Sequence, residues 1–510
     1  TGGTPRVTPP QPATASPFDH PDAQRRFRIM SNVEELERAL EYPWDKWTVF
    51  LHPDQRQLVE KRFNGPAKVA GSAGTGKTIV ALHRAVHLAR SNPDARVLLT
   101  TFSPTLANAL RTRLRRLIGN EPQLGERLEV HAIESIAMRL HKLHLGECVL
   151  ASDAQVREAL AIASKESGEH KFTLSFLQAE WLHVVDARQL DSWDGYRDVP
   201  RLGRKTRLKE PQRLKLWAIV DRVRANLAAQ KLITAAGMYT SLAAALEKLR
   251  RPPFDFVVVD EAQDVSIAQL RMLAVMGKHR ADALFFAGDT GQRIFQQPFS
   301  WAAFGVDMRG RSKSLKVNYR TSHQIRKQAD HLLDGSVTDA DGNAEKRNDT
   351  ISVFNGPVPA VRKFADAKQE GLAVGEWLKG LSGTGLAPHE LGVFVRSEAE
   401  VPRAIAAVTA AGLPHLVLDE YVDTISGKVA IGTMHMAKGL EFRAVAVMAC
   451  DDDVLPLQAR IETVGDEGDL DEAYNTERQL LYVACTRARD HLLVSGKEPA
   501  SEFLDDLAVP

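Results

Sequence analysis

The stretch Gly71-Ser72-Ala73-Gly74-Thr75-Gly76-Lys77-Thr78 decides the fold of this chain, because it is a complete G-x-x-x-x-G-K-[ST] loop. A short, mostly apolar run, Ala67 to Ala70, precedes it, and residues 79–88 read as a helix. Glycines turn backbone N–H groups toward phosphate oxygens, and the helix N-terminus adds positive potential. In this context Lys77 is predicted to reach the β- and γ-phosphates, and the Thr78 hydroxyl to bind Mg²⁺. The predicted phosphate cradle is Gly71, Ser72, Ala73, Gly74, Thr75 and Gly76.

A second motif supplies the carboxylates that hydrolysis requires. Phe256 to Val259 is an apolar run typical of a buried parallel strand. Asp260-Glu261-Ala262-Gln263-Asp264 follows directly. A carboxylate at such a strand end can hold Mg²⁺, usually through water, and its neighbour can orient or deprotonate the attacking water. We therefore assign Asp260, with Thr78, to the metal and Glu261 to the water, and we expect ATP and Mg²⁺ as cofactors.

Length and composition indicate an ordinary soluble protein of several domains. A chain of 510 residues predicts about two to four domains. The net charge of +1 does not indicate a polyanion partner, so any nucleic-acid site is local. Cys148, Cys450 and Cys485 have no C-x-x-C spacing, which argues against zinc, an iron–sulfur cluster or disulfides and favours a reducing cytosol. No apolar run approaches the roughly 20 residues of a membrane span, and the N-terminus does not resemble a signal peptide, so a cytoplasmic location is expected.

Apolar runs alternate with helical patterns along most of the chain. This alternation predicts an α/β fold with parallel sheets in two lobes. The first 20 residues are rich in Pro, Thr and Ala and read as a flexible linker. The chain also starts without Met, which favours a fragment of a longer protein. The predicted domains are a linker (1–20), a helical lead-in (21–50), a first lobe (51–140 and 251–305) with a helical insertion (141–250), a second lobe (306–500) and a tail (501–510).

The organisation suggests that two lobes close over one nucleotide, because the second α/β pattern contains no second phosphate loop. Its strand-like runs are 392–395, 415–418, 429–431 and 444–448. The helical insertion carries a basic stretch that is either a solvated face or a contact for a phosphate backbone. Its cations are Arg201, Arg204, Lys205, Arg207, Lys209, Arg213 and Lys215.

Taken together, the motifs resemble those of the UvrD/Rep-like helicases of superfamily 1. Their order and spacing match from residue 51 to about residue 495. The resemblance implies two RecA-like lobes around one ATP site. Besides the phosphate loop and the acidic turn, the matching motifs are Leu51-His52-Pro53-Asp54-Gln55 (Q motif), Thr101-Phe102-Ser103 (Ia), Val130-His131-Ala132 (Ib), residues 288–295 (III), Asn318-Tyr319-Arg320 (IV), residues 433–442 (V) and residues 481–488 (VI).

The resemblance also implies roles for residues that contact the nucleotide. Arg320 and Arg487 would be arginine fingers, which can be worth about 10³–10⁵ in rate. Both would come from the second lobe, so lobe closure would complete the site. Gln292 resembles a γ-phosphate sensor. The residues implied at the base and sugar are Gln55, which would read adenine, Tyr319, which would stack on it, and Glu441, which would bind the ribose.

A single strand is held by aromatic stacking and by phosphate contacts. By resemblance, Phe102 and Phe295 would contact bases, and Thr433 and His435 would touch the strand. His131, in the weaker motif Ib, is a further candidate. His435 has no companion suited to metal binding, so strand contact or core packing is expected of it.

The chain departs from the family pattern in two places. Gln297 and Pro298 stand where an aromatic residue and an Arg usually follow the motif III aromatic. A stacking platform is therefore missing, or displaced toward Phe299 or Trp301. Only residues 420–428 lie where relatives insert the helical 2B accessory domain, so the sequence predicts a form without 2B.

Three functions remain open at this point. The first is an ATP-driven translocase or helicase on single-stranded DNA or tailed duplex, working as a monomer with 3′ to 5′ polarity. The second is a remodeller of protein–nucleic-acid complexes, as in HelD-type relatives, with RNA or a protein complex as partner. The third is a regulatory module, fused to another domain, in which ATP switches a binding surface. No membrane partner is expected.

Overall fold

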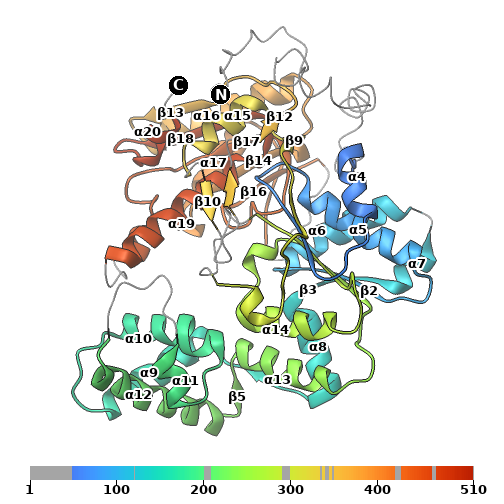
Figure 1. Cartoon of the computed structure of the whole chain (residues 1–510). Coiled ribbons are helices and arrows are strands. Elements are labelled where there is room, and N and C mark those ends of the chain that lie inside the picture. Colours follow the sequence, from blue (N-terminus) through green and yellow to red (C-terminus); the bar gives the residue numbers. More distant parts are fainter. Residues whose placement is uncertain are drawn as a thin grey trace, which may run out of the picture.

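The structure of the protein is a computed structural model that describes residues 49–119, 121–199, 208–289, 299–333, 336–338, 344–346, 350–419, 427–461 and 467–508. These residues form two parallel sheets, each with helices on both faces, and a separate group of helices (Figure 1). The predicted α/β fold with two lobes is therefore confirmed. The predicted linker (1–20) and almost all of the lead-in (21–50) lie outside the described residues.

The first sheet carries the phosphate loop. Its strands lie in the order β3-β2-β6-β7-β1-β8, and each pairing is parallel. Parallel neighbours need a crossover connection, which here contains helices. The strands are β1 (Ala67–Ala70), β2 (Val97–Thr101), β3 (Leu128–Ala132), β6 (Phe256–Val259), β7 (Leu284–Ala287) and β8 (Ser312–Ser314).

Successive residues of the central strands face opposite helical layers. Leu99 and Val258 belong to a core with α5 and α6, whereas Leu98 and Val257 belong to a core with α8, α13 and α14. A strand buried on both faces must be continuously apolar, which explains why these short runs fold as strands. The helices of this lobe are α4 (Pro53–Glu60), α5 (Lys77–Ser91), α6 (Pro104–Ile118), α7 (Pro122–Arg127), α8 (Ile133–Leu145), α13 (Ala235–Glu247) and α14 (Ile267–Gly277), with short 3-10 helices η2 (Ala262–Asp264) and η3 (Ala302–Phe304).

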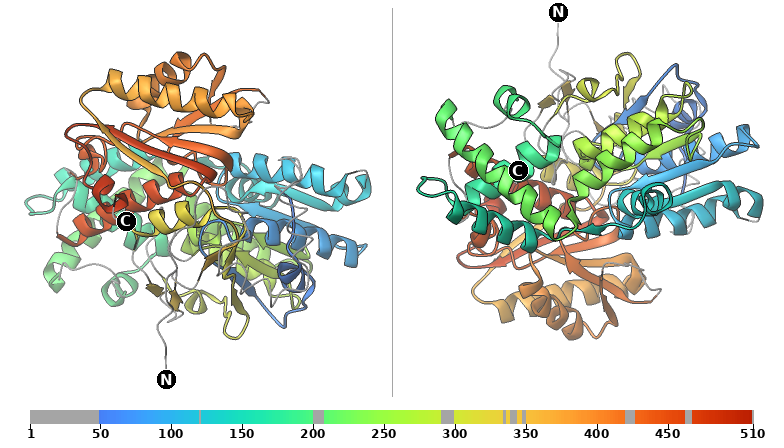
Figure 2. Two further views of the ribbon diagram at one scale, coloured as in Figure 1. Left: turned by 90° about the horizontal axis from the view of Figure 1, so that it is seen from above. Right: turned by 90° about the horizontal axis from the view of Figure 1, so that it is seen from below.

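A group of helices lies apart from both sheets and has its own apolar core (Figures 1 and 2). The core is built around Trp181, Tyr196 and Leu216. It fills only the middle of the predicted insertion (141–250), because α13 packs against α14 in the first lobe. The elements are α9 (Asp153–Glu166), α10 (Leu174–Glu180), the π-helix η1 (Trp181–Asp186), α11 (Trp193–Asp198) and α12 (Glu210–Ala229), and the parallel pair β4 (Val149–Leu150) and β5 (Leu232–Ile233) lies at its entry and exit.

The second sheet has the strand order β13-β18-β17-β14-β16-β15, again with parallel pairings. One face packs on α15, α19 and α20, and the other packs on α16 and α17. The strands are β13 (Ala360–Phe364), β14 (Leu391–Val395), β15 (His415–Val417), β16 (Val429–Thr433), β17 (Phe442–Val447) and β18 (Ala488–Lys497). The helices are α15 (His323–Asp330), α16 (Ala367–Gly383), α17 (Val401–Ala410), α18 (Gln458–Ile461), α19 (Glu467–Cys485) and α20 (Phe503–Leu507), with 3-10 helices η5 (Pro388–Glu390) and η6 (Glu398–Glu400).

The connection between the lobes differs from the sequence prediction. Strand β8 (Ser312–Ser314) pairs with β1, so the first sheet runs past residue 305, where the sequence predicted the end of this lobe. The strand is polar and exposed, so it carries no apolar signal. The other domain boundaries stay predictions. Two short pairs follow, β9 (Val317–Asn318) with β12 (Ile351–Ser352) and β10 (Ser336–Thr338) with β11 (Ala344–Lys346).

The sheet topology brings distant motifs to one edge. The phosphate loop, Phe102, Asp260 and Gly288 each follow directly after a strand of the first sheet. Thr100 lies opposite His131 in the register of β2 and β3, and the Asp260 N–H donates to the Thr100 carbonyl at 2.8 Å. Because the carboxyl ends of parallel strands meet at one edge, the phosphate loop and the acidic turn become neighbours.

Candidate active site

The phosphate loop is shaped by glycines with backbone angles that other residues disfavour. Gly74 has φ +76° and Gly76 has φ +82°, in the left-handed region. A Cβ atom at Gly74 would collide with the side chain of Asn318, and one at Gly76 would collide with that of Gln55. Gly76 is also the N-cap of α5, so the loop ends at a helix N-terminus. These contacts explain why glycine is required here.

Lys77 lies within the curl of the loop. Its ammonium donates to the carbonyl of Gly71 at 2.6 Å and to that of Ser72 at 2.9 Å. It also lies 4.0 Å from the Asp289 carboxylate, which follows β7. The Lys77 ammonium thus donates its hydrogen bonds to loop carbonyls. It lies where the oxygens of a bound polyphosphate would accept these hydrogen bonds instead.

Thr78, Asp260 and Glu261 form the acidic side of the site. The Thr78 side chain hydrogen bonds to Asp260, which is buried. Burial and the adjacent Glu261 charge raise the pKa of Asp260 to about 7. A hydroxyl and a carboxylate are the oxygen donors that Mg²⁺ prefers, so the donor set fits this ion.

The Glu261 carboxylate, predicted to activate the attacking water, is fixed by contacts with two neighbouring side chains. Gln263 Nε2 donates to its carboxylate at 2.5 Å, and Lys438 Nζ lies 3.7 Å away. Burial would raise the pKa of Glu261, but the charges of Lys438, Lys77 and Arg487 outweigh it and lower the pKa. The carboxylate is therefore ionised at neutral pH and able to accept a proton or hydrogen bond from water.

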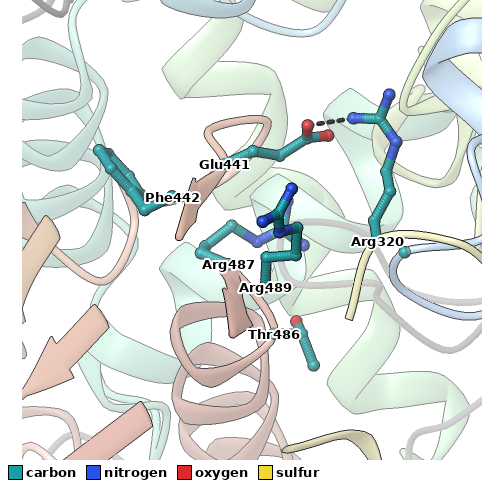
Figure 3. Close-up of a pocket in the computed structure, with 7 residues that line it drawn as sticks. Arg320, Glu441, Phe442, Thr486, Arg487 and Arg489 are labelled. Atoms are coloured by element: carbon teal, nitrogen blue, oxygen red, sulfur yellow. Dashed lines mark hydrogen bonds and ion pairs between the residues drawn. The ribbon is translucent and has the colours of Figure 1, made fainter. Parts of the chain in front are cut away.

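Both predicted arginine fingers reach this site from the second lobe. Figure 3 shows Arg320 paired with Glu441, and Arg487 beside them. Arg487 follows α19, and its Nε donates to the Val483 carbonyl at 2.9 Å. A pocket opens between the lobes at this point. It is lined by Gly74, Arg320, Glu441, Phe442, Thr486, Arg487 and Arg489.

A second pocket also has Arg320 in its lining. Its lining includes Tyr319 and His52, whose rings stack at a centroid distance of 4.5 Å. Gln55 Nε2 donates to the Thr75 carbonyl at 2.8 Å, which ties the Q motif to the phosphate loop. Gln55 and Tyr319, the residues predicted to contact adenine, line the same pocket. An aromatic ring beside an amide suits a planar base. Glu441, whose role at the ribose stays a prediction, pairs with Arg320 and lies 3.7 Å from Arg113.

The predicted strand-contacting residues fall at the same edges of the sheets. Phe102 follows β2, and His131 is the residue before the last of the edge strand β3; both side chains are half-buried. Thr433 and His435 lie at the end of β16. Burial lowers the pKa of His131, although Glu129 opposes it, and burial with the Arg396 charge lowers that of His435 to about 4. Both imidazoles are therefore neutral at pH 7.

Of the two alternatives for the stacking platform, missing or displaced toward Phe299 or Trp301, the structure excludes the second. Phe299 and Trp301 are each 5% exposed, and both lie in the core of the first lobe, where the Trp301 ring meets Phe286 edge-on at 5.0 Å. Neither is a displaced stacking platform, because their faces are covered by the core. Gln292 and Phe295, and the unusual pair Gln297 and Pro298, lie outside the described residues.

Three residues of the site had no role in the sequence interpretation. Asn318 Nδ2 donates to the Ala73 carbonyl at 3.0 Å, and its Oδ1 accepts from the Arg320 N–H at 2.9 Å. Lys438 pairs with Asp264 across the lobes. Arg113 on α6 approaches Glu441. Asn318 and Lys438 stand within motifs IV and V. Arg113 also had a signal, since it occupies the apolar face set by Leu106, Leu110 and Leu114.

Two family models match the chain. The UvrD/REP helicase N-terminal domain covers residues 51–299, and the UvrD-like helicase C-terminal domain covers residues 416–498. This chain belongs to the UvrD/Rep-like helicase family. The protein is therefore an ATP-dependent DNA helicase, as the order of its motifs predicted.

Relatives that align with most of this chain support the family assignment. DNA helicase IV of Escherichia coli is 25% identical, over 90% of this chain and 71% of its own. ATP-dependent DNA helicase UvrD2 of Mycobacterium tuberculosis is 23% identical, over 87% of this chain and 78% of its own. A probable DNA helicase of Mycoplasma pneumoniae is 23% identical, over 84% and 80%. In the described part of the helicase, no helix has the length and apolar character needed to cross a membrane.

Proposed function

We propose that this helicase is an ATP-driven motor that moves along single-stranded DNA from 3′ to 5′. The observation that carries the proposal is the composite nucleotide site. Lys77 and Glu261 come from one lobe, whereas Arg320 and Arg487 come from the other, and all of them face one region. A site divided in this way links hydrolysis to relative motion of the lobes.

The chain's own residues account for ATP and Mg²⁺ binding. The loop amides and Lys77 would hold the phosphates, Thr78 and Asp260 would hold the ion, and Tyr319 with Gln55 would hold the base. When bound, ATP supplies a phosphoanhydride bond, the cleavage of which releases the free energy for motion. Glu261 would orient and deprotonate the attacking water, and the arginines would stabilise the departing charge.

The strand path is proposed along the carboxyl edges of both sheets. Phe102 offers a ring for base stacking, and Thr433 offers a hydroxyl to the backbone. Because His131 and His435 are neutral at pH 7, they would contact the strand by hydrogen bonds. Any counterion release must therefore come from lysine and arginine side chains.

Strand affinity is expected to fall steeply with salt. Contacts to several phosphates release counterions, so the dissociation constant should rise by about tenfold or more between roughly 50 and 200 mM NaCl. Fluorescence anisotropy with a labelled oligonucleotide measures this. Neutralising Lys209, Arg213 and Lys215 together tests the helical insertion. Unchanged affinity and slope in that variant would assign this part of the insertion to a solvated face.

The link between β15 and β16 bears on what kind of motor this is. These strands are neighbours in the second sheet, paired through Leu416 and Ala430, and residues 418–428 join them. Such a short link supports the proposal that no 2B domain is inserted there. Without a 2B domain that could contact duplex DNA here, we expect translocation on one strand rather than unwinding of blunt duplex.

Stopped-flow translocation assays test the proposal. Oligonucleotides labelled at either end, as DNA and as RNA, are compared at saturating ATP. We expect arrival signals at the 5′ end of DNA that scale with strand length, and unwinding only of duplex with a 3′ tail. Movement toward the 3′ end, or ATPase activity indifferent to nucleic acid, would contradict the proposed motor. Activity confined to protein–nucleic-acid complexes would favour a remodeller.

A further inference from the structure

One turn of the second lobe, Lys438 to Glu441, lies against the first lobe. Lys438 pairs with Asp264 and lies 3.7 Å from Glu261. Gly439 has φ +76°, and a Cβ there would overlap the side chain of Leu106 on α6. Glu441 pairs with Arg320 of its own lobe. The turn therefore contacts both the water-activating acid and helix α6.

Arg113 is the polar anchor of this contact on α6. Its side chain is 11% exposed, and its Nη2 donates to the Gly439 carbonyl at 3.3 Å. The same nitrogen lies 3.7 Å from the Glu441 carboxylate. Burial would raise the pKa of Glu441, but the charges of Arg320 and Arg113 lower it. Glu441 is thus an ionised carboxylate shared by an arginine of each lobe.

Helix α6 begins at the predicted strand contact. Ser103 is its N-cap and accepts from the Leu106 N–H at 3.3 Å, and Phe102 comes immediately before it. Leu106 is the residue that packs on Gly439. A shift of Phe102 would therefore move the first turn of α6 and, through a rigid helix, Arg113.

We propose that Arg113 is a positioning residue that couples strand binding at Phe102 to the arginine in the ATP site. Through Glu441 it sets where Arg320 is held, and through Gly439 it fixes the turn to α6. Strand binding would shift α6 and release Arg320 from Glu441 toward the phosphates. This inference rests on the proposed function, because it assumes that a strand contacts Phe102.

The test compares ATPase rates with and without a saturating oligonucleotide. Arg113→Ala should lower the ratio of the two rates by about tenfold, since small misplacements of a catalytic group cost one to two orders of magnitude. Strand affinity should stay within about twofold, because Arg113 is buried away from the strand path. Arg113→Lys should give an intermediate ratio, because lysine keeps the positive charge but loses the fixed planar geometry with which the guanidinium presents its donors.

Arg115→Ala is the matched control, since Arg115 is exposed on the same helix. It should leave both rates and the melting temperature unchanged. If Arg113→Ala does not fold, Arg113→Gln takes its place in the same comparison. A folded Arg113 variant with the parent's ratio overturns the coupling role, as does equal loss of both rates. If the ATPase rate of the unmodified protein does not change when the oligonucleotide is added, the proposed function is overturned, and the coupling role of Arg113 is overturned with it.

Discussion

Replacing Glu261 with glutamine is expected to leave ATP binding intact and to slow hydrolysis by about 10²–10⁴-fold. The substitution removes the carboxylate that is proposed to accept from water, but it keeps the size of the side chain and the left-handed backbone at this position, φ +54°. Lys438 keeps its partner Asp264, so the contact between the lobes survives. Steady-state ATPase with an oligonucleotide, together with fluorescent-nucleotide binding, measures the two effects separately.

Glu247→Gln is the matched control for this variant. Glu247 is an exposed carboxylate of the same lobe that pairs with Lys278, and such surface pairs contribute little to stability. Its rate should equal that of the parent. A Glu261→Gln protein that turned over at the parent's rate would show that another group activates the water.

Replacing Arg487 with alanine should lower the strand-stimulated rate by about 10³-fold or more, because a charge that stabilises the leaving phosphoryl group is lost. ATP binding should weaken far less, since Lys77 and the loop remain. Arg487→Lys should restore only a small part of the rate, because an ammonium cannot reproduce the planar fork.

Arg362→Ala serves as the control in the second lobe, because Arg362 is exposed on β13, away from the site. Melting curves of both variants exclude a loss of fold. If Arg487→Ala lost nucleotide affinity and kept its rate when saturated, the arginine would bind the ground state rather than the transition state.

The local motifs explain why so much of the site could be predicted. The phosphate loop and the acidic turn each follow an apolar run, so strand, loop and helix are adjacent in the sequence. Central strands such as Phe256–Val259 are buried on both faces and stand out as apolar runs. The family then supplied Arg320 and Arg487, which come from motifs far along the chain.

Contacts between the lobes could not be predicted in this way. Arg113 approaches Glu441, and Lys438 pairs with Asp264, only because the two lobes pack together. Strand β8 could not be predicted from the sequence, because Ser312–Ser314 is polar and lies at the edge of the sheet. Phe299 and Trp301 were considered as platforms because composition alone cannot tell a core aromatic from an exposed one.

The place of Arg487 at the start of β18 has a mechanical consequence. With ten residues, β18 is the longest of the described strands, and it is hydrogen bonded to β13 on one side and β17 on the other. A force on Arg487 during phosphate release would therefore load β18, the strand next to the edge strand β13, in shear across many ladder hydrogen bonds at once, rather than bend a loop. The second lobe should therefore move as a rigid body, and little of the movement should be lost to deformation within its sheet.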